Sequence, residues 1–318
     1  MTVAEFVRQI TGRVIPAVPV PFRSDGTIHV EAQQRHIEYM AARRVGAVAV
    51  WAHTGRGLHL SPDQRRLVLS AWRSGSRVPI IAGVGACDGT DPDASAVRMA
   101  EEALRGGADA LLVHPPTPYR DYPDARARIL GYHQALDRLG APLILFDLYT
   151  DAGGVPYPPE LLRELLALPS VAGVKLATMN DCVRVQDTVD LLRAFPGKIP
   201  ITGEDRFLEA SIMWGCTSAL IGIASARTDL SVELLAAYMD GRYQRFVELA
   251  KQLDRFARFI FRAPMEGYIR RMLEVLVIEK VIPPSAAFDP FGPALTEEDL
   301  LGVHAAVRDL DAVAPQGR

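Results

Sequence analysis

The sequence predicts a (β/α)8 barrel followed by a C-terminal helical segment. Short runs rich in Val, Ile, Leu and Ala recur eight times in about 230 residues, and amphipathic stretches of helical length separate them. Runs that are apolar on both faces are typical of parallel strands covered by helices. Eight alternating strand and helix units predict a closed barrel. We therefore expect residues 1–240 to form the barrel with a short N-terminal helix, and residues 241–318 to form helices packed on it.

The elements follow one another in regular order along the chain. The eight predicted strands cover residues 14–20, 47–52, 79–84, 110–113, 142–148, 171–176, 199–202 and 218–223. The helices between and after them are expected over 30–44, 62–74, 92–105, 125–139, 158–168, 182–194, 206–214 and 230–239. Three more helices are expected over 242–261, 265–279 and 296–310.

A doubly wound open sheet is the alternative architecture. That fold usually has fewer strands and a glycine-rich turn that binds a nucleotide. The nearest match is Gly83-Val84-Gly85-Ala86, which lacks the third glycine. The count of strands and this missing glycine favour the barrel.

Composition and charge limit the classes of partner. The chain has 318 residues, of which 49% are hydrophobic and 23% charged, as is usual for a globular protein. A net charge of −3 argues against nucleic acid or an anionic membrane as a partner. The N-terminus has an early acidic residue and no apolar core, so we do not expect a secretory signal. Three cysteines without close spacing favour a reducing cytoplasm over disulfides or a zinc site.

Lys175 is the most informative residue. Only four of the 35 basic residues are lysines, and this one lies inside the predicted strand 171–176. Burial favours the uncharged amine, whereas an arginine would stay charged. A neutral amine is the nucleophile that forms a Schiff base with a ketone. The alternative is that Lys175 pairs with an acid or extends its ammonium group to the end of the strand.

The carboxyl ends of barrel strands form the active site, and here they collect polar side chains. These groups suit a reaction on a ketone that needs proton transfer. In chain order they are His53, Thr54, Gly55 and Arg56; His114, Thr117 and Tyr119; Asp147 and Tyr149; Gly203, Glu204 and Asp205; and Ser225 and Arg227.

Several segments, taken in order, resemble the dihydrodipicolinate synthase / N-acetylneuraminate lyase family. Val171-Ala172-Gly173-Val174-Lys175 is similar to its Schiff-base strand, and Ala52-His53-Thr54-Gly55-Arg56 stands where the family has Gly-Thr-Thr-Gly-Glu. Gly203-Glu204-Asp205 and Gly215-Cys216-Thr217-Ser218-Ala219-Leu220 resemble the segments of the seventh and eighth strands. The resemblance runs from about Gly12 to the C-terminal helices.

The resemblance implies a class I lyase or aldolase that acts on pyruvate or another 2-oxo acid. It implies no cofactor or metal, a cytoplasmic location, and a homodimer or homotetramer. Lys175 and Tyr149 would be the catalytic residues. The substrate would be bound by Thr54, His53, Gly55, Leu220, Gly203 and Tyr119.

The chain departs from the family pattern at the proton relay. The family has a relay tyrosine at the end of the fifth strand, where this chain has Phe146. Phe146 cannot transfer a proton, so Tyr149, Asp147 or His114 would have to replace it. His53 stands in place of a threonine and Arg56 in place of a glutamate.

Three alternatives stay open at this stage. The same imine supports dehydration of a keto-deoxy sugar acid. A metal-dependent enzyme would use His53, His114, Asp147 and Glu204 as ligands. Loss of the relay tyrosine is also compatible with a barrel that binds a keto acid without catalysis.

Overall fold

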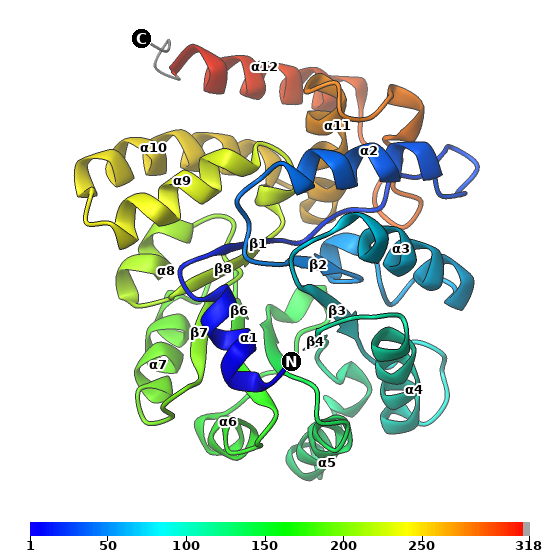
Figure 1. The fold of residues 1–318 in the computed structure, drawn as a ribbon, viewed down its shortest axis with the longest axis vertical. Coiled ribbons are helices and arrows are strands. Elements are labelled where there is room, and N and C mark those ends of the chain that lie inside the picture. The colour runs from blue at the N-terminus through cyan, green and yellow to red at the C-terminus, as the bar shows by residue number, and fades with distance from the viewer. Residues whose placement is uncertain (314–318) are drawn as a thin grey trace.

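Eight parallel strands form the centre of the molecule and helices surround them (Figure 1). The structure is a computed structural model, and it describes residues 1–313. The strand order is β1-β8-β7-β6-β5-β4-β3-β2, and a bridge between Ala17 and Ala49 joins the first strand to the second. The predicted (β/α)8 barrel is therefore confirmed. The strands are β1 (Val14–Pro16), β2 (Val48–Val50), β3 (Ile80–Val84), β4 (Ala110–Val113), β5 (Leu143–Leu148), β6 (Val171–Ala177), β7 (Ile199–Thr202) and β8 (Ser218–Ile221).

The helices also lie close to their predicted positions. Ser61 and Asp91 cap two of them, each accepting a hydrogen bond from a backbone N–H in the first turn. The barrel helices are α1 (Val3–Ile10), α2 (Val30–Ala41), α3 (Pro62–Gly75), α4 (Pro92–Arg105), α5 (Ala125–Asp137), α6 (Pro159–Leu166), α7 (Cys182–Leu192), α8 (Leu208–Trp214) and α9 (Thr228–Met239). After them come α10 (Tyr243–Ile260), α11 (Tyr268–Ile278) and α12 (Glu297–Val313).

Three strands end earlier than predicted. The strand predicted over 14–20 ends at Pro16. Ala17 and Val18 still donate to Ile221 and Ala49, but Pro19 and Pro21 have no N–H to continue the ladder. The strand predicted over 47–52 ends before Trp51, whose φ of 55° takes the chain out of the extended conformation. The last strand ends at Ile221 and is followed by a 3₁₀ turn rather than extended backbone.

The interior of the barrel is filled by small and branched side chains. Alanines such as Ala49 and Ala110 alternate there with larger residues such as Ile81 and Ile201. Phe6 and Ile10 of α1 are fully buried in the same cluster. The barrel is thus a packed core, in which the carboxyl ends of the strands are left for polar groups.

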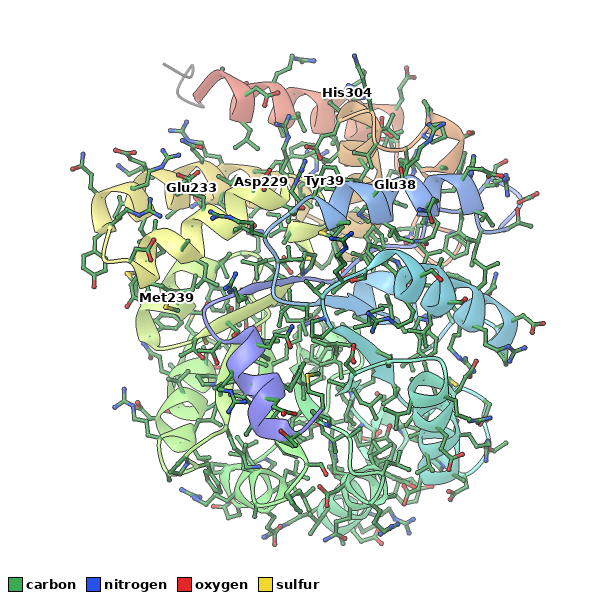
Figure 2. The ribbon with its side chains drawn as sticks, viewed as in Figure 1. Glu38, Tyr39, Asp229, Glu233, Met239 and His304 are labelled. Carbon is green, nitrogen blue, oxygen red and sulfur yellow. The ribbon has the colours of Figure 1, made fainter. Side chains whose placement is uncertain are left out.

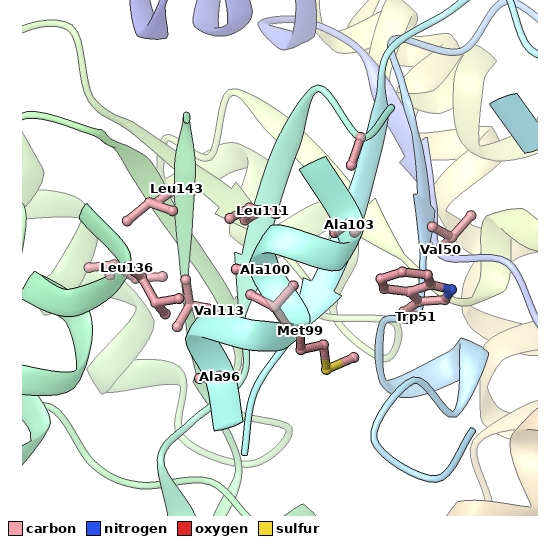
Figure 3. Close-up of a cluster of buried hydrophobic side chains, with 14 of the residues drawn as sticks. Val50, Trp51, Ala96, Met99, Ala100, Ala103, Leu111, Val113, Leu136 and Leu143 are labelled. Carbon is pink, nitrogen blue, oxygen red and sulfur yellow. The ribbon is translucent and has the colours of Figure 1, made fainter. Parts of the chain in front are cut away.

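A second core lies between the strands and the outer helices. Figure 3 shows one part of it, where Ala96, Met99, Ala100 and Ala103 of α4 lie on one helical face. Residues of β4 such as Leu111 belong to the same cluster. A spacing of three and four residues on α4 is what a helix needs to cover a sheet.

The C-terminal helices are fixed to the barrel by polar contacts as well as apolar ones. Tyr39 of α2 lies beside α9 (Figure 2), and its hydroxyl donates to the Glu279 carboxylate at 3.3 Å. The same hydroxyl accepts from the backbone N–H of Thr228.

The division of the chain into a barrel and a C-terminal helical segment at residue 240 stays a proposal. Among the described residues, no helix combines the length and apolar character that a bilayer crossing requires.

Candidate active site

Lys175 lies on β6 near the carboxyl end of the barrel. Its side chain is 5% exposed, and its strand neighbours are Phe146 on β5 and Ile201 on β7. The Lys175 Nζ lies 4.1 Å from the centroid of the Phe146 ring. Gly203 leaves the space that the lysine occupies, since a Cβ at that position would lie 2.6 Å from Lys175 Cε.

The charge state of Lys175 is shifted toward the neutral amine. Burial lowers its pKa to about 8, and the carboxylates of Asp205 and Glu204 oppose this shift in part. Glu204 accepts hydrogen bonds from the backbone N–H groups of Thr178 and Met179. Burial raises the pKa of Glu204 to about 7. Lys175 therefore has a larger fraction of nucleophilic amine at neutral pH than an ordinary lysine.

The loop after β2 brings Thr54 into the barrel mouth. Residues His53–Gly55 form a 3₁₀ turn, and Arg56 after it has a left-handed φ of 53°. Thr54 is buried, and its Oγ1 lies 2.9 Å from the hydroxyl of Tyr268 at the start of α11. A Cβ at Gly55 would lie 3.0 Å from the carbonyl oxygen of Val18, so a glycine suits this close approach.

Glu266 connects three residues across the mouth. It lies in the 3₁₀ turn Met265–Gly267 before α11. Its carboxylate is 2.9 Å from His53 Nε2 and 2.7 Å from an Arg56 guanidinium nitrogen. It also accepts from the Tyr149 hydroxyl at 3.4 Å. Burial alone would raise the pKa of Glu266, but His53 and Arg56 lower it to about 2.

The guanidinium group of Arg56 forms ion pairs with two carboxylates. Besides Glu266, it contacts Asp289, with nitrogen–oxygen distances of 2.7 and 3.2 Å in a forked arrangement. Arg227 likewise pairs with Glu279 and Asp311. Both arginines thus form salt bridges.

The candidate replacements for the relay tyrosine are differently placed. Asp147 forms an ion pair with Arg184 of α7, on the outer side of β5. His114 is buried, with its Nε2 3.1 Å from the carbonyl oxygen of Trp51, and burial lowers its pKa to about 3. Tyr149 follows β5 directly, and burial, with Glu266 nearby, raises its pKa above the usual value. Among these three, Tyr149 belongs to the Glu266 network.

Two predicted substrate-binding residues lie apart from that network. The Tyr119 hydroxyl donates to Asp93 of α4 at 2.8 Å. Leu220 of β8 is fully buried in the barrel interior. Their roles in binding stay predictions.

The four proposed metal ligands are not brought together. His53 contacts Glu266, His114 contacts Trp51, Asp147 contacts Arg184 and Glu204 contacts Thr178. Within residues 1–313, no group of three or more His, Cys, Asp or Glu side chains is arranged to hold a metal ion.

Sequence reasoning did not identify Glu266, Tyr268 or Asp289. All three follow the eighth strand by more than 40 residues and belong to the C-terminal helical segment. The sequence pattern predicts a helix over 265–279, but it does not indicate which of its side chains face the barrel mouth. Their identification required the packing of α11 against the loop after β2.

Comparisons with known proteins identify the family of this chain. The profile of the Dihydrodipicolinate synthetase family matches residues 10–309. A 4-hydroxy-tetrahydrodipicolinate synthase of Archaeoglobus fulgidus is 25% identical over 304 residues, which cover 95% of this chain and 99% of that protein. A probable mitochondrial 4-hydroxy-2-oxoglutarate aldolase of Emericella nidulans is 22% identical and covers 73% of this chain and 76% of its own length.

Solved structures show the same fold. The sialic acid aldolase of Ruminococcus gnavus has a TM-score of 0.83 and 21% identity, and covers 96% of this chain and 98% of its own. A prophage protein of Escherichia coli K12, solved in complex with pyruvate, has a TM-score of 0.82 and 19% identity. It covers 94% of this chain and 98% of its own. The chain therefore belongs to the dihydrodipicolinate synthetase family and is a lyase of the class I aldolase type.

Proposed function

We propose that Lys175 forms a Schiff base with pyruvate or a closely related 2-oxo acid, and that the enzyme makes or breaks a C–C bond at the adjacent carbon. The observation that carries this proposal is the buried Lys175, whose pKa is lowered to about 8 at the carboxyl end of β6. A buried, partly neutral lysine is the group that imine chemistry requires.

Names of related proteins support the class of substrate. The E. coli structure holds pyruvate, and the R. gnavus aldolase has a catalytic lysine. Sialic acid and 4-hydroxy-2-oxoglutarate are both 2-oxo acids that an aldolase cleaves to a 2-oxo acid and an aldehyde. We therefore propose 2-oxo acids with a 4-hydroxyl group as substrates in the cleavage direction.

The loop after β2 is the proposed carboxylate site. Thr54 has a buried hydroxyl at the barrel mouth, and the backbone N–H groups of His53 and Thr54 begin the 3₁₀ turn beside it, where the first N–H groups have no partner within the turn. The N–H of Gly55 donates to the carbonyl oxygen of Ala52. A hydroxyl and backbone amides are suitable donors for a carboxylate. The side chain of Arg56 is already paired with Glu266 and Asp289. The substrate carboxylate would therefore be bound by the Thr54 hydroxyl and the backbone N–H groups of the loop.

The imine allows the C–C bond to break. The Lys175 nitrogen bonds to C2 of the 2-oxo acid, and the carbonyl oxygen leaves as water with the two amine protons. When the proton of the 4-hydroxyl group is removed, the C3–C4 bond breaks. The proton from the 4-hydroxyl group passes to the imine nitrogen, the electron pair of the C3–C4 bond becomes the C2=C3 double bond of the enamine, and C4 leaves as an aldehyde. Protonation of C3 and hydrolysis then return pyruvate and the free lysine.

Pyruvate release tests this function. The purified protein is incubated with a panel of 4-hydroxy-2-oxo acids and keto-deoxy sugar acids, and pyruvate is followed by its reduction with lactate dehydrogenase and NADH. We expect release from at least one member, and none from Lys175→Arg, which stays charged. A 2-oxo product formed without pyruvate would show dehydration instead. No product of either kind across the panel would contradict the proposal.

Assembly and location are also proposals. Val183 of α7 and Met213 of α8 are exposed apolar side chains on helices that contact each other, which supports a homodimer or homotetramer. Three unpaired cysteines support a cytoplasmic location. Sedimentation equilibrium measures the oligomeric state directly, and a monomer at micromolar concentration would contradict the proposed homodimer or homotetramer.

A further inference from the structure

Imine chemistry needs a group that moves protons at the substrate, and β5 does not supply one. Phe146 faces Lys175 at 4.1 Å and has no exchangeable proton. Tyr149 is the next hydroxyl along the chain, but it donates to Glu266 at the mouth. The proton-transferring hydroxyl therefore has to come from another element.

Tyr268 at the first position of α11 provides such a hydroxyl. Its ring is buried, and its oxygen lies 2.9 Å from Thr54 Oγ1. Thr54 is the residue that we propose for carboxylate binding, so the pair lies where the substrate would be held. Each hydroxyl of the pair can donate or accept, which is what a relay of protons requires.

The surroundings of Gly222 place this pair near the lysine. A Cβ built on Gly222 would lie 3.1 Å from Thr54 Oγ1, 3.1 Å from Tyr268 Cε2 and 3.8 Å from a carboxylate oxygen of Asp205. Asp205 also acts electrostatically on Lys175. Thr54, Tyr268 and Asp205 therefore surround one point at the end of β8, and the carboxylate of Asp205 acts on the charge of Lys175 from there.

The position of Tyr268 is fixed by its neighbours. Phe261 stacks on its ring at 4.6 Å and His53 lies on it at 6.4 Å. The fully buried guanidinium of Arg271, one turn later in α11, donates to the carbonyl oxygens of Ile260, Arg262 and Pro264. The turn that leads into Tyr268 is therefore held from inside the protein.

We propose that Tyr268, with Thr54, is the proton-relaying hydroxyl of this active site, an inference that rests on the Schiff-base function proposed above. As the Lys175 nitrogen bonds to C2 and the C2–O bond breaks, Tyr268 gives its proton to the departing oxygen. It takes back a proton from the nitrogen through Thr54 or the substrate. The amine loses two protons, the oxygen leaves with two as water, and Tyr268 is unchanged. When the imine becomes the enamine, the C3–H bond breaks and Tyr268 accepts that proton, while its own proton passes through Thr54 to the imine nitrogen. The reverse transfer returns a proton to C3.

Exchange of the pyruvate methyl protons in D2O tests the relay without a second substrate. Proton NMR gives the exchange rate, and borohydride trapping followed over time gives the amount of imine. We compare the wild type with Tyr268→Phe, Tyr149→Phe and Lys175→Arg. Tyr132→Phe is the matched control, because Tyr132 is a buried tyrosine of α5 outside the mouth. Thermal unfolding confirms that each variant is folded.

We expect Tyr268→Phe to lower exchange by about 100-fold or more, the usual contribution of a positioned acid or base. Its lysine adduct should still accumulate, only more slowly. Tyr132→Phe should exchange at the wild-type rate. Exchange that is lost in Tyr149→Phe but kept in Tyr268→Phe would assign the relay to Tyr149 and overturn the proposal. Wild-type exchange in a folded Tyr268→Phe that forms the adduct would overturn the relay and leave the Schiff base intact. A wild-type protein with neither adduct nor exchange would overturn the proposed function and the relay with it.

Discussion

Phe146 and Lys175 are register partners on β5 and β6, and the lysine nitrogen lies over the aromatic face at 4.1 Å from the ring centroid. The negative face of an aromatic ring attracts an ammonium ion. Phe146 thus opposes part of the effect of burial on the lysine. We therefore expect Phe146, which stands where the family has its relay tyrosine, to affect the charge of Lys175.

Phe146→Leu tests this relationship. Leucine keeps an apolar side chain but removes the aromatic face, so the ammonium form of Lys175 loses its partner. We expect the pH at half-maximal pyruvate exchange to fall by roughly half a unit, which corresponds to about 0.7 kcal/mol. An unchanged or higher midpoint would show that the ring does not act on the lysine.

The pH profile of exchange in the wild type follows from the lowered pKa of Lys175. The reactive form is the neutral amine, and the pKa is about 8 instead of its usual 10.5. The rate should therefore rise about tenfold per unit between pH 6 and 7.5 and level off above pH 8.5. A rate that keeps rising to pH 10 would show that Lys175 has the pKa of an ordinary lysine and would contradict the lowered value.

Asp205→Asn should move that profile. The Asp205 carboxylate stabilises the ammonium form of Lys175, so its removal lowers the lysine pKa further. We expect the midpoint to shift to lower pH by about one unit, with Lys175 still trapped by borohydride. A shift in the opposite direction would contradict the electrostatic account.

Gly203→Ala should displace the nucleophile. A methyl group there would lie 2.6 Å from Lys175 Cε and 2.9 Å from the Leu176 carbonyl oxygen, closer than atoms pack. We expect adduct formation to fall more than about tenfold, because a displacement near 1 Å at the reacting groups has such effects. Gly131→Ala is the control, since its added methyl meets nothing within 4 Å, and it should react normally. Equal rates for the two variants would contradict the close packing at Gly203.

Glu266→Gln should loosen the barrel mouth and reduce stability. The folded-state pKa of Glu266 is about 2, below its usual 4.5. The stabilisation by the ionised form is therefore complete above about pH 4.5 and is lost as the pH falls toward 2. The side chain is 35% exposed, so solvent screening reduces the loss at pH 7 to about 1–2 kcal/mol. Urea unfolding should show this difference at pH 7 and a smaller one at pH 3, and a difference that grows on acidification would contradict it.

The barrel and its nucleophile could be predicted because their signals are local. Each strand is a short apolar run, and Lys175 lies inside one of them. The lengths of the strands were less well predicted, because Pro19, Pro21 and the left-handed Trp51 end pairing inside apolar segments. An apolar pattern shows burial but does not show which backbone groups find a partner.

The mouth of the barrel could be predicted only in part. His53 and Thr54 were identified because they follow a strand directly. Glu266 and Tyr268 meet them from more than 200 residues away, as their hydrogen bonds show. These contacts depend on how α11 packs on the barrel, and a helical pattern in the sequence does not determine that.

The most direct test of the central claim is to identify the lysine that pyruvate modifies. The protein is treated with pyruvate and borohydride, and intact mass and peptide mapping locate the reduced adduct. We predict one adduct on Lys175 and none on Lys198, Lys251 or Lys280, with no adduct at all in Lys175→Arg. An adduct on another lysine, or no adduct with pyruvate and longer 2-oxo acids, would contradict the Schiff-base mechanism.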